Sequence, residues 1–122
     1  MAEGRPVDEP GLLVFWEGVL GDVLDCTGRF PKSARFSLAS RIDERSLDVL
    51  ECLAEARFAA VPRRREVLAT ADLHLAVLRV LLRVSYDRRL LDPKALERLS
   101  RDMDEAGRML GGWRRALGAR EP

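Results

Sequence analysis

Apolar residues recur three and four positions apart along four long stretches of the chain, a spacing typical of amphipathic helices. The stretches cover residues 11–27, 33–60, 63–89 and 92–117. Residues that favour turns, such as Gly28, Pro31 and Pro62, lie between them. No run rich in Val, Ile or Thr alternates apolar with polar positions, as a half-buried strand would. The pattern therefore predicts an all-α chain.

Each stretch carries one apolar stripe that a bundle core could bury. In the first, the stripe is Leu12, Trp16, Val19, Leu20, Val23 and Leu24. In the second, it is Phe36, Ala39, Ile42, Ser46, Val49, Leu53, Ala56 and Ala60. In the third, it is Leu68, Ala71, Leu75, Leu78, Leu82 and Ser85. In the fourth, it is Leu96, Leu99, Met103, Ala106, Leu110, Trp113 and Leu117. Long helices with short links fold back on one another, so we expect an antiparallel up-down-up-down four-helix bundle over residues 11–117. Disordered tails are expected at residues 1–10 and 118–122.

The two middle helices are apolar over a wider arc than one bundle core needs. The additional stripe of the second helix is Leu47, Leu50, Ala54 and Phe58. The additional stripe of the third helix is Leu73, Val77, Val80 and Val84. These stripes form either an oligomer interface, which we favour, or part of a more completely wrapped core.

Local signals indicate where helices begin and end. Gly28 is expected to act as a C-cap glycine after the first helix, and Ser33 as the N-cap of the second. Asp92-Pro93 combines an N-cap with a first-turn proline before the fourth helix. Inside the first helix, Gly18 and Gly21 indicate either a close approach of a neighbouring backbone or two surface positions without a packing role.

The formal net charge is only +1, but the charges are unevenly distributed. Residues 1–28 carry a net charge of −5, residues 29–45 of +3, residues 46–62 of −2, residues 63–91 of +4 and residues 92–122 of +1. Positive charge is therefore concentrated around the first turn and along the third helix. All basic residues except two are Arg, which reflects either contacts with phosphates and carboxylates or a GC-rich or thermophilic host.

The chain carries features of a reduced cytoplasmic protein. Its two cysteines, Cys26 and Cys52, resemble small buried hydrophobes, and their expected offset of roughly 20 Å along the bundle is too large for a disulfide within one chain. The N-terminal residues are acidic and lack the apolar segment of a signal peptide. No uncharged run approaches the length that spans a membrane.

The sequence carries no recognisable catalytic or metal-binding pattern. His74 is the sole histidine, and it lacks the Glu-x-x-His spacing of metal sites in bundles. Nothing in the spacing brings Cys26 or Cys52 to His74 as a nucleophile and base pair. No glycine-rich phosphate loop or Gly-x-Ser-x-Gly elbow occurs. We therefore expect a protein that is not an enzyme and that needs no cofactor or metal.

The remaining candidates for chemistry are basic residues that could contact a polyanion or a protein partner. Among them, Arg79 stands within an apolar stripe, where it would serve either an ion pair between subunits or a phosphate contact. The expected nucleic-acid- or partner-binding residues are Lys32, Arg35, Arg41, Arg79, Arg83, Arg88 and Arg89. The triplet Arg63–Arg65 opens the third helix, where the helix dipole disfavours cations, and indicates either a binding role or simple solvation.

Three segments resemble a known family. The basic, aromatic-flanked turn at residues 30–36 (FPKSARF) is similar to the turn of small four-helix proteins of the ribosomal-RNA intervening-sequence type. The same turn occurs in the accessory variability determinant (Avd) proteins of diversity-generating retroelements. Residues 47–59 (LDVLECLAEARFA) and 107–113 (GRMLGGW) look more like the Avd branch. The likeness covers about residues 11–117.

The Avd resemblance implies a non-catalytic bundle that assembles into a pentameric ring. Such a ring partners the reverse transcriptase of the same element and contacts template RNA or cDNA during mutagenic copying. Avd proteins tend to be strongly basic, and this chain departs from that. Two alternatives remain open: an intervening-sequence-type four-helix protein of undefined role, and a helical protein-interaction module without nucleic-acid binding.

Overall fold

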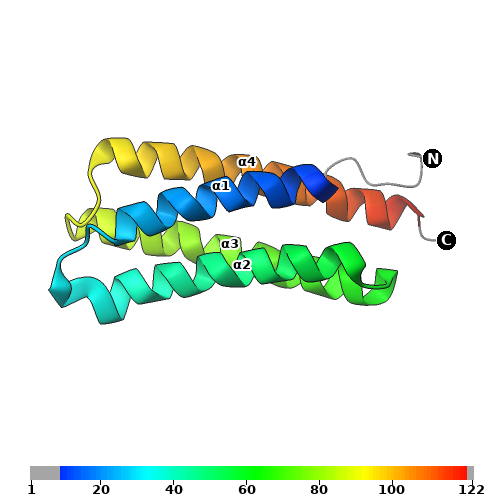
Figure 1. Ribbon diagram of the computed structural model, residues 1–122. Coiled ribbons are helices and arrows are strands. Elements are labelled where there is room, and N and C mark those ends of the chain that lie inside the picture. The colour runs from blue at the N-terminus through cyan, green and yellow to red at the C-terminus, as the bar shows by residue number, and fades with distance from the viewer. Residues whose placement is uncertain (1–8, 121–122) are drawn as a thin grey trace.

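The computed structural model describes residues 9–120 and contains four α-helices: α1 (Glu9–Thr27), α2 (Ser40–Phe58), α3 (Val61–Asp87) and α4 (Pro93–Arg120). These residues include no strand, which confirms the all-α prediction. Figure 1 shows the four helices side by side, with the chain reversing its direction at each connection. The tails expected at residues 1–10 and 118–122 fall partly outside the described residues, and α1 and α4 extend into the rest of these ranges.

The core is built from the four expected stripes. Every stripe residue of α3 is buried, and so are the α4 stripe residues after Leu96. Two tryptophans, Trp16 and Trp113, are the largest fully buried side chains. The indole Nε1 of Trp16 donates a hydrogen bond to the backbone carbonyl of Ser46, at 2.9 Å, and so connects α1 to α2 inside the core. Burial of this aliphatic and aromatic surface supplies most of the driving force for folding.

The first helix departs from the expected stripe on its outer edge. Leu20 is half-buried and Leu24 is 41% exposed, so the buried face of α1 is narrower than its sequence indicates. Gly28 follows α1 directly, as expected, but its φ is not positive and it is not a left-handed C-cap. Its N–H instead donates to the carbonyl of Leu24, at 2.9 Å, which continues the helical hydrogen bonding by one residue.

The glycines of α1 make no close approach to another part of the described chain. A Cβ added at Gly18 or Gly21 would meet no atom within 4 Å. Both residues are exposed, so the second of the two sequence interpretations holds within the single chain.

Gly21→Ala is expected to raise the free energy of unfolding by about 0.5–1 kcal/mol, because alanine loses less backbone entropy in a helix and meets no steric obstacle here. Urea denaturation followed by circular dichroism measures the change. Gly111→Ala is the control and should gain less, since its Cβ would lie 3.3 Å from Nη1 of Arg115. A loss of stability in Gly21→Ala would contradict an open position.

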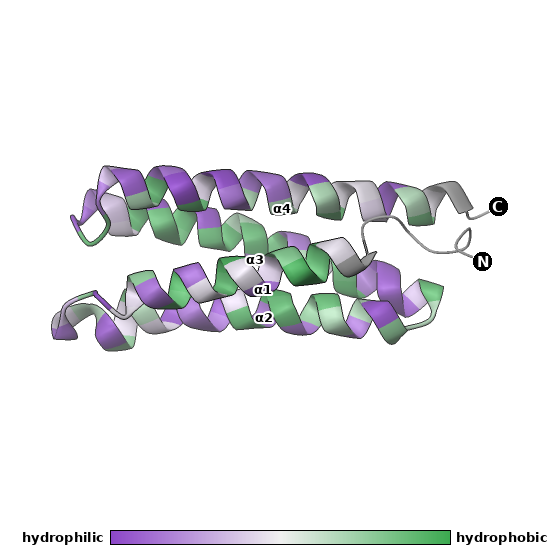
Figure 2. Cartoon of the chain, turned by 45° about the horizontal axis from the view of Figure 1, so that its top comes forward, coloured by the Kyte–Doolittle hydropathy of each residue, from purple (hydrophilic) through white to green (hydrophobic). Residues whose placement is uncertain are grey.

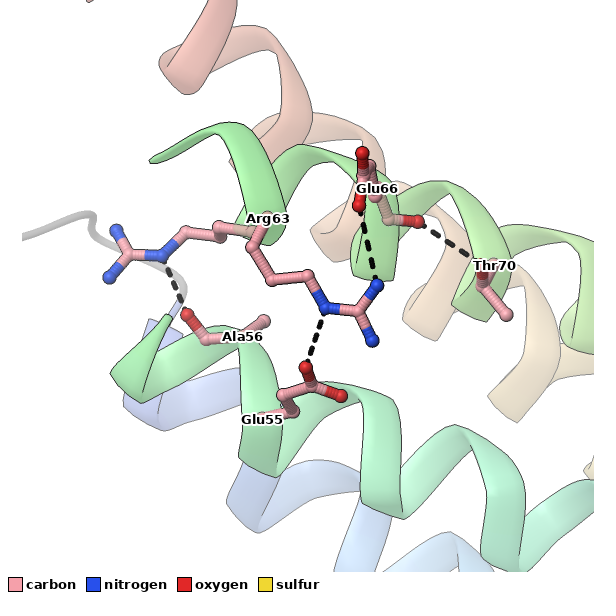
Figure 3. Close-up of polar contacts among 6 residues, drawn as sticks. Glu55, Ala56, Arg63, Glu66 and Thr70 are labelled. Atoms are coloured by element: carbon pink, nitrogen blue, oxygen red, sulfur yellow. Dashed lines mark hydrogen bonds and ion pairs between the residues drawn. The ribbon is translucent and has the colours of Figure 1, made fainter. Parts of the chain in front are cut away.

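The α2–α3 connection explains two of the three arginines at the start of α3 (Figure 3). Arg63 forms ion pairs with Glu55, at 2.7 Å, and with Glu66, at 3.3 Å. Arg64 donates to the carbonyl of Ala56, at 2.6 Å, and to that of Arg57, at 3.3 Å. These carbonyls belong to the last turn of α2 and have no partner within the helix. Both side chains thus stabilise the turn.

Asp102 of α4 lies close to α1, in a place where the negative charge of its carboxylate is unfavourable. Burial raises the pKa of the Asp102 carboxyl above its ordinary value, and the negative charge of Asp22 raises it further. A carboxyl with a raised pKa destabilises the fold while it is ionised, and this penalty disappears as the pH falls below its pKa.

Asp102→Asn is therefore expected to raise Tm at pH 7 by a small amount, about 1–2 °C. The difference between the variant and the wild type should vanish near pH 3, where the wild-type carboxyl is protonated. Thermal denaturation at the two pH values measures it. An equal difference at both pH values, or a lower Tm of the variant at pH 7, would contradict the assigned cause.

Both cysteines are free, with Cys26 buried and Cys52 half-buried, which agrees with the expected absence of a disulfide between them. Burial raises the pKa of the Cys52 thiol, and the nearby carboxylates of Asp48, Glu55 and Glu51 add to the effect. None of the helices described is long and apolar enough to cross a membrane.

Candidate partner-binding surface

Two connections meet at one end of the bundle and bring distant basic residues into the same region. Figure 1 shows the α1–α2 connection, residues 28–39, and the α3–α4 connection, residues 88–92, at the same end of the helices. Lys32 and Arg35 belong to the first connection, and Arg88 and Arg89 to the second. All four residues are exposed. Four of the seven expected binding residues are thus placed at one end of the molecule.

The α1–α2 connection is more helical than a simple turn. A short 3₁₀-helix, η2 (Lys32–Ala34), is followed by a π-helix, η3 (Arg35–Ala39), which leads directly into α2. The backbone N–H of Ser40 donates to the carbonyl of Arg35, five residues earlier, and this bond defines the π-turn. The expected N-cap role of Ser33 is wrong, because Pro31 holds the N-cap position of η2 and no side chain caps it.

The π-turn corrects the expected place of Phe36. The sequence assigns Phe36 to the core stripe that continues through Ala39 and Ile42. The structure leaves the Phe36 side chain 88% exposed, whereas Ala34 and Ala39, five residues apart, are buried. The additional residue of a π-turn rotates the chain relative to α-helical spacing, so Phe36 is turned away from the buried face. Ala60, at the other end of the expected stripe, is also exposed, because α2 ends at Phe58.

The basic residues of this connection and of the first turn of α2 are not neutralised within the chain. Between positions 29 and 41, the sequence contains Arg29, Lys32, Arg35 and Arg41 and no acidic residue. All four side chains are exposed, and none forms an ion pair or side-chain hydrogen bond within residues 9–120. The nearest acid in sequence, Asp43, accepts a hydrogen bond from the hydroxyl of Thr27, at 2.6 Å, and so joins α1 to α2. This connection therefore has unneutralised positive charge.

The α3–α4 connection holds Arg89 in an unusual backbone conformation. Arg89 has a φ of 65°, the single positive φ found at a non-glycine residue in the described chain. The N–H of Leu90 donates to the carbonyl of Ser85, at 2.8 Å, and the N–H of Arg89 to that of Tyr86, at 2.9 Å. These two bonds form a Schellman motif, in which glycine is the usual residue at the left-handed position. At the end of the same connection, Asp92 caps α4 as expected: its side chain accepts a hydrogen bond from the backbone N–H of Ala95, at 2.7 Å.

Arg89→Gly is expected to raise the free energy of unfolding by about 0.5–1 kcal/mol, because glycine adopts a positive φ without steric cost. If the Arg89 side chain binds a polyanion, the same variant should bind heparin more weakly while being more stable. Denaturation and the salt concentration of elution from heparin measure the two effects. Arg88→Gly, one residue earlier at a negative φ, is the control and should be destabilised.

Arg79 is engaged within the chain, which neither sequence interpretation anticipated. Its Nη1 forms an ion pair with Asp104 of α4, at 2.5 Å, and its Nη2 donates to the carbonyl of Met103, at 3.1 Å. Gly107 leaves room for this guanidinium, since a Cβ there would lie 3.2 Å from Nη2. Arg79 thus connects α3 to α4. Arg83, one helical turn further on, is exposed and forms no ion pair within the described residues.

The additional apolar stripes of α2 and α3 reach the surface. Leu73, Val80 and Val84 of α3 are 60%, 47% and 38% exposed. On α2, Leu47 and Phe58 are exposed and the stripe residues between them are half-buried. Figure 2 shows that hydrophobic residues reach further along α1 than along α4, which is mostly hydrophilic. The exposed stripe residues of α2 and α3 are apolar surface that the single chain leaves unburied and that an oligomer could cover.

The two stripes lie on different sides of the molecule. On α2, the stripe lies on the same helix face as Asp43, which accepts a hydrogen bond from Thr27 of α1. On α3, the stripe lies opposite the buried residues Leu75 and Leu78. The α2–α3 contact itself is polar at one point, where Nη1 of Arg45 donates to Nδ1 of His74, at 2.8 Å.

His74 lies against Arg45 of α2. Because a guanidinium can only donate, Nδ1 of His74 is the acceptor of this hydrogen bond. Among residues 9–120, no group of three or more His, Cys, Asp or Glu side chains could hold a metal ion.

Sequence reasoning missed three residues of this surface. Arg29 lies in the same acid-free segment as Lys32 and contributes to the +3 charge of residues 29–45, but it was not among the expected binding residues. The exposure of Phe36 has no signal in the sequence, because the π-turn that causes it interrupts an otherwise regular spacing. Gly107 matters only through its contact with Arg79, which depends on how α3 and α4 are aligned.

Comparison with known proteins identifies one family. The family described as bAvd-like matches residues 16–117, which is most of the chain. No curated protein sequence matches the chain significantly.

Proposed function

Since the chain belongs to the bAvd-like family, we propose that it is a non-catalytic accessory protein of a diversity-generating retroelement. In this role, it forms an oligomeric ring that binds the reverse transcriptase of the same element. The ring also contacts template RNA or cDNA during mutagenic copying. The observation that carries the proposal is the basic end of the bundle, where exposed cations without partners from two connections lie together.

The distribution of charge supports a polyanionic partner. Each phosphate contact by Lys or Arg contributes to affinity through the release of counterions. Lys32, Arg35 and Arg41 approach such a partner from the α1–α2 side, and Arg88 and Arg89 from the other connection. Arg83 extends the surface along α3. Arg79, whose guanidinium is paired with Asp104, serves to position α3 against α4 and contributes to binding indirectly.

The separation of the two apolar stripes supports a ring. When an interface joins two different patches of each subunit, the subunits associate head to tail, and such contacts form a ring when the rotation between subunits closes. The α3 stripe of one subunit would pack on the α2 stripe of the next. A ring also repeats the basic end once in every subunit, so a net charge of +1 per chain is compatible with a strong local field.

A charge placed within the α3 stripe tests the assembly. Val80→Glu should convert the wild-type oligomer into a monomer of 13.7 kDa with unchanged helicity, as measured by light scattering and circular dichroism. Val14→Glu is the matched control: Val14 is 66% exposed on α1, outside both stripes, and should leave the oligomer intact. A wild-type chain that is monomeric at all concentrations would remove the ring from the proposal.

A further inference from the structure

Phe36 is the most exposed of the large apolar side chains in residues 11–118, with Phe58 next at 82%. Phe58 belongs to the additional α2 stripe assigned to the subunit interface, and the Arg57 guanidinium lies 5.6 Å from the centre of its ring. Phe36 has no comparable ring contact in the described chain. The π-helix η3 holds it outward, and π-turns are frequent at functional sites.

The surroundings of Phe36 combine an apolar surface with positive charge. The residues that line a shallow hollow beside it include Leu24, Phe30, Phe36, Arg35 and Asp43. The Asp43 carboxylate accepts a hydrogen bond from the Thr27 hydroxyl, and the Arg35 guanidinium forms no ion pair within the described residues. Arg29 and Lys32 precede it in the same acid-free segment.

We propose that Phe36 is a stacking platform for an unpaired base of single-stranded nucleic acid, whose phosphates contact Arg29, Lys32 and Arg35. The inference deepens the proposed function and rests on it. Unneutralised cations near an outward aromatic ring are an arrangement by which proteins bind single strands without reading sequence. The cations complement the charge of the backbone, and the ring complements the flat face of the base. In a duplex, the bases are already stacked and paired, so the site selects single strands.

The test measures the binding of a fluorescein-labelled oligothymidylate by anisotropy, with the same strand annealed to its complement as the duplex probe. Phe36→Ala should weaken single-strand binding about tenfold, and Phe36→Trp should retain it. Phe36→Trp also places a tryptophan in the site, so binding should quench the tryptophan fluorescence of this variant more than that of the wild type. Val14→Ala is the matched control, since it shortens an exposed apolar side chain on α1, outside both stripes and both connections, and it should bind as the wild type does.

Salt dependence separates the ring from the cations. The logarithm of the affinity falls linearly with the logarithm of the salt concentration, with a slope set by the number of phosphate contacts. Lys32→Gln should reduce this slope by the amount of about one contact, and Phe36→Ala should leave it unchanged. Light scattering of Phe36→Ala must show the wild-type mass. Unchanged single-strand affinity in Phe36→Ala would overturn the inference, and so would a changed mass, because Phe36 would then belong to a subunit interface.

The inference and the proposed function fail in different ways. Absence of single-strand binding by the wild type overturns the inference, but co-purification of the reverse transcriptase would still support the accessory role. Equal affinity for single strand and duplex also overturns the stacking platform, although it leaves a polyanion-binding surface in place. Loss of both strand binding and polymerase binding would remove the proposed function as well.

Discussion

Replacing Trp16 with alanine is expected to lower the free energy of unfolding by about 3–5 kcal/mol. The indole is fully buried, so its removal leaves a cavity between α1 and α2 and eliminates the hydrogen bond to the Ser46 carbonyl. Domains of this size are stable by only about 5–15 kcal/mol, so this substitution would remove a large share of the total. Chemical denaturation at a fixed protein concentration measures the loss, because the stability of an oligomer depends on concentration.

Phenylalanine substitutions separate the hydrogen bond from the cavity. Trp16→Phe keeps an aromatic ring but loses the bond from Nε1 to Ser46. Trp113 is also fully buried, but its Nε1 has no hydrogen-bond partner within the described residues, so Trp113→Phe loses no bond. Trp16→Phe should therefore cost about 1 kcal/mol more than Trp113→Phe. Equal costs would show that the Trp16 bond contributes nothing to stability.

Reversing the charge of the first connection should have the largest effect on binding. In the double variant Lys32→Glu and Arg35→Glu, we expect loss of binding to the reverse transcriptase and to heparin. Both side chains are exposed and form no ion pair within the described chain, so helicity and thermal stability should remain close to those of the wild type. Reversal replaces two attractive contacts with two repulsive ones, which affects both the rate of association and the affinity.

The control is a second double variant of equal charge, Arg98→Glu and Arg115→Glu. These exposed residues lie on α4, outside the two connections, and the substitution changes the net charge by the same amount. Binding retained in the control and lost in the first variant would locate the surface at the α1–α2 connection. An equal loss in both variants would indicate that only the overall charge matters and would contradict a local site.

Apolar periodicity predicted the architecture because burial of one face decides where each helix lies. The stripe from Leu68 to Ser85 is buried in full, and the Asp92-Pro93 signal places the start of α4 correctly. The same reasoning failed where the helical repeat changes. Phe36 has α-helical spacing from Ala39 in the sequence, but the π-turn is a backbone event that no residue type there announces.

The sequence did not predict the polar contacts between helices. The pairing of Arg79 with Asp104 depends on the relative alignment of α3 and α4, which spacing within one helix does not fix. The sequence leaves Arg64 open between a binding role and simple solvation, because only the finished α2–α3 turn brings it to the carbonyl of Ala56. The left-handed Arg89 replaces the glycine that would have signalled a Schellman motif. For Arg79 and Arg64 the missing information is tertiary, whereas for Arg89 it is a local backbone conformation that the residue type does not signal.

The most direct measurement is co-purification of the tagged chain with the reverse transcriptase of its own locus, washed at moderately high salt. The account predicts a stable complex of fixed stoichiometry that is lost in the Lys32→Glu and Arg35→Glu double variant. A folded, oligomeric chain that fails to retain a soluble polymerase would contradict the accessory role.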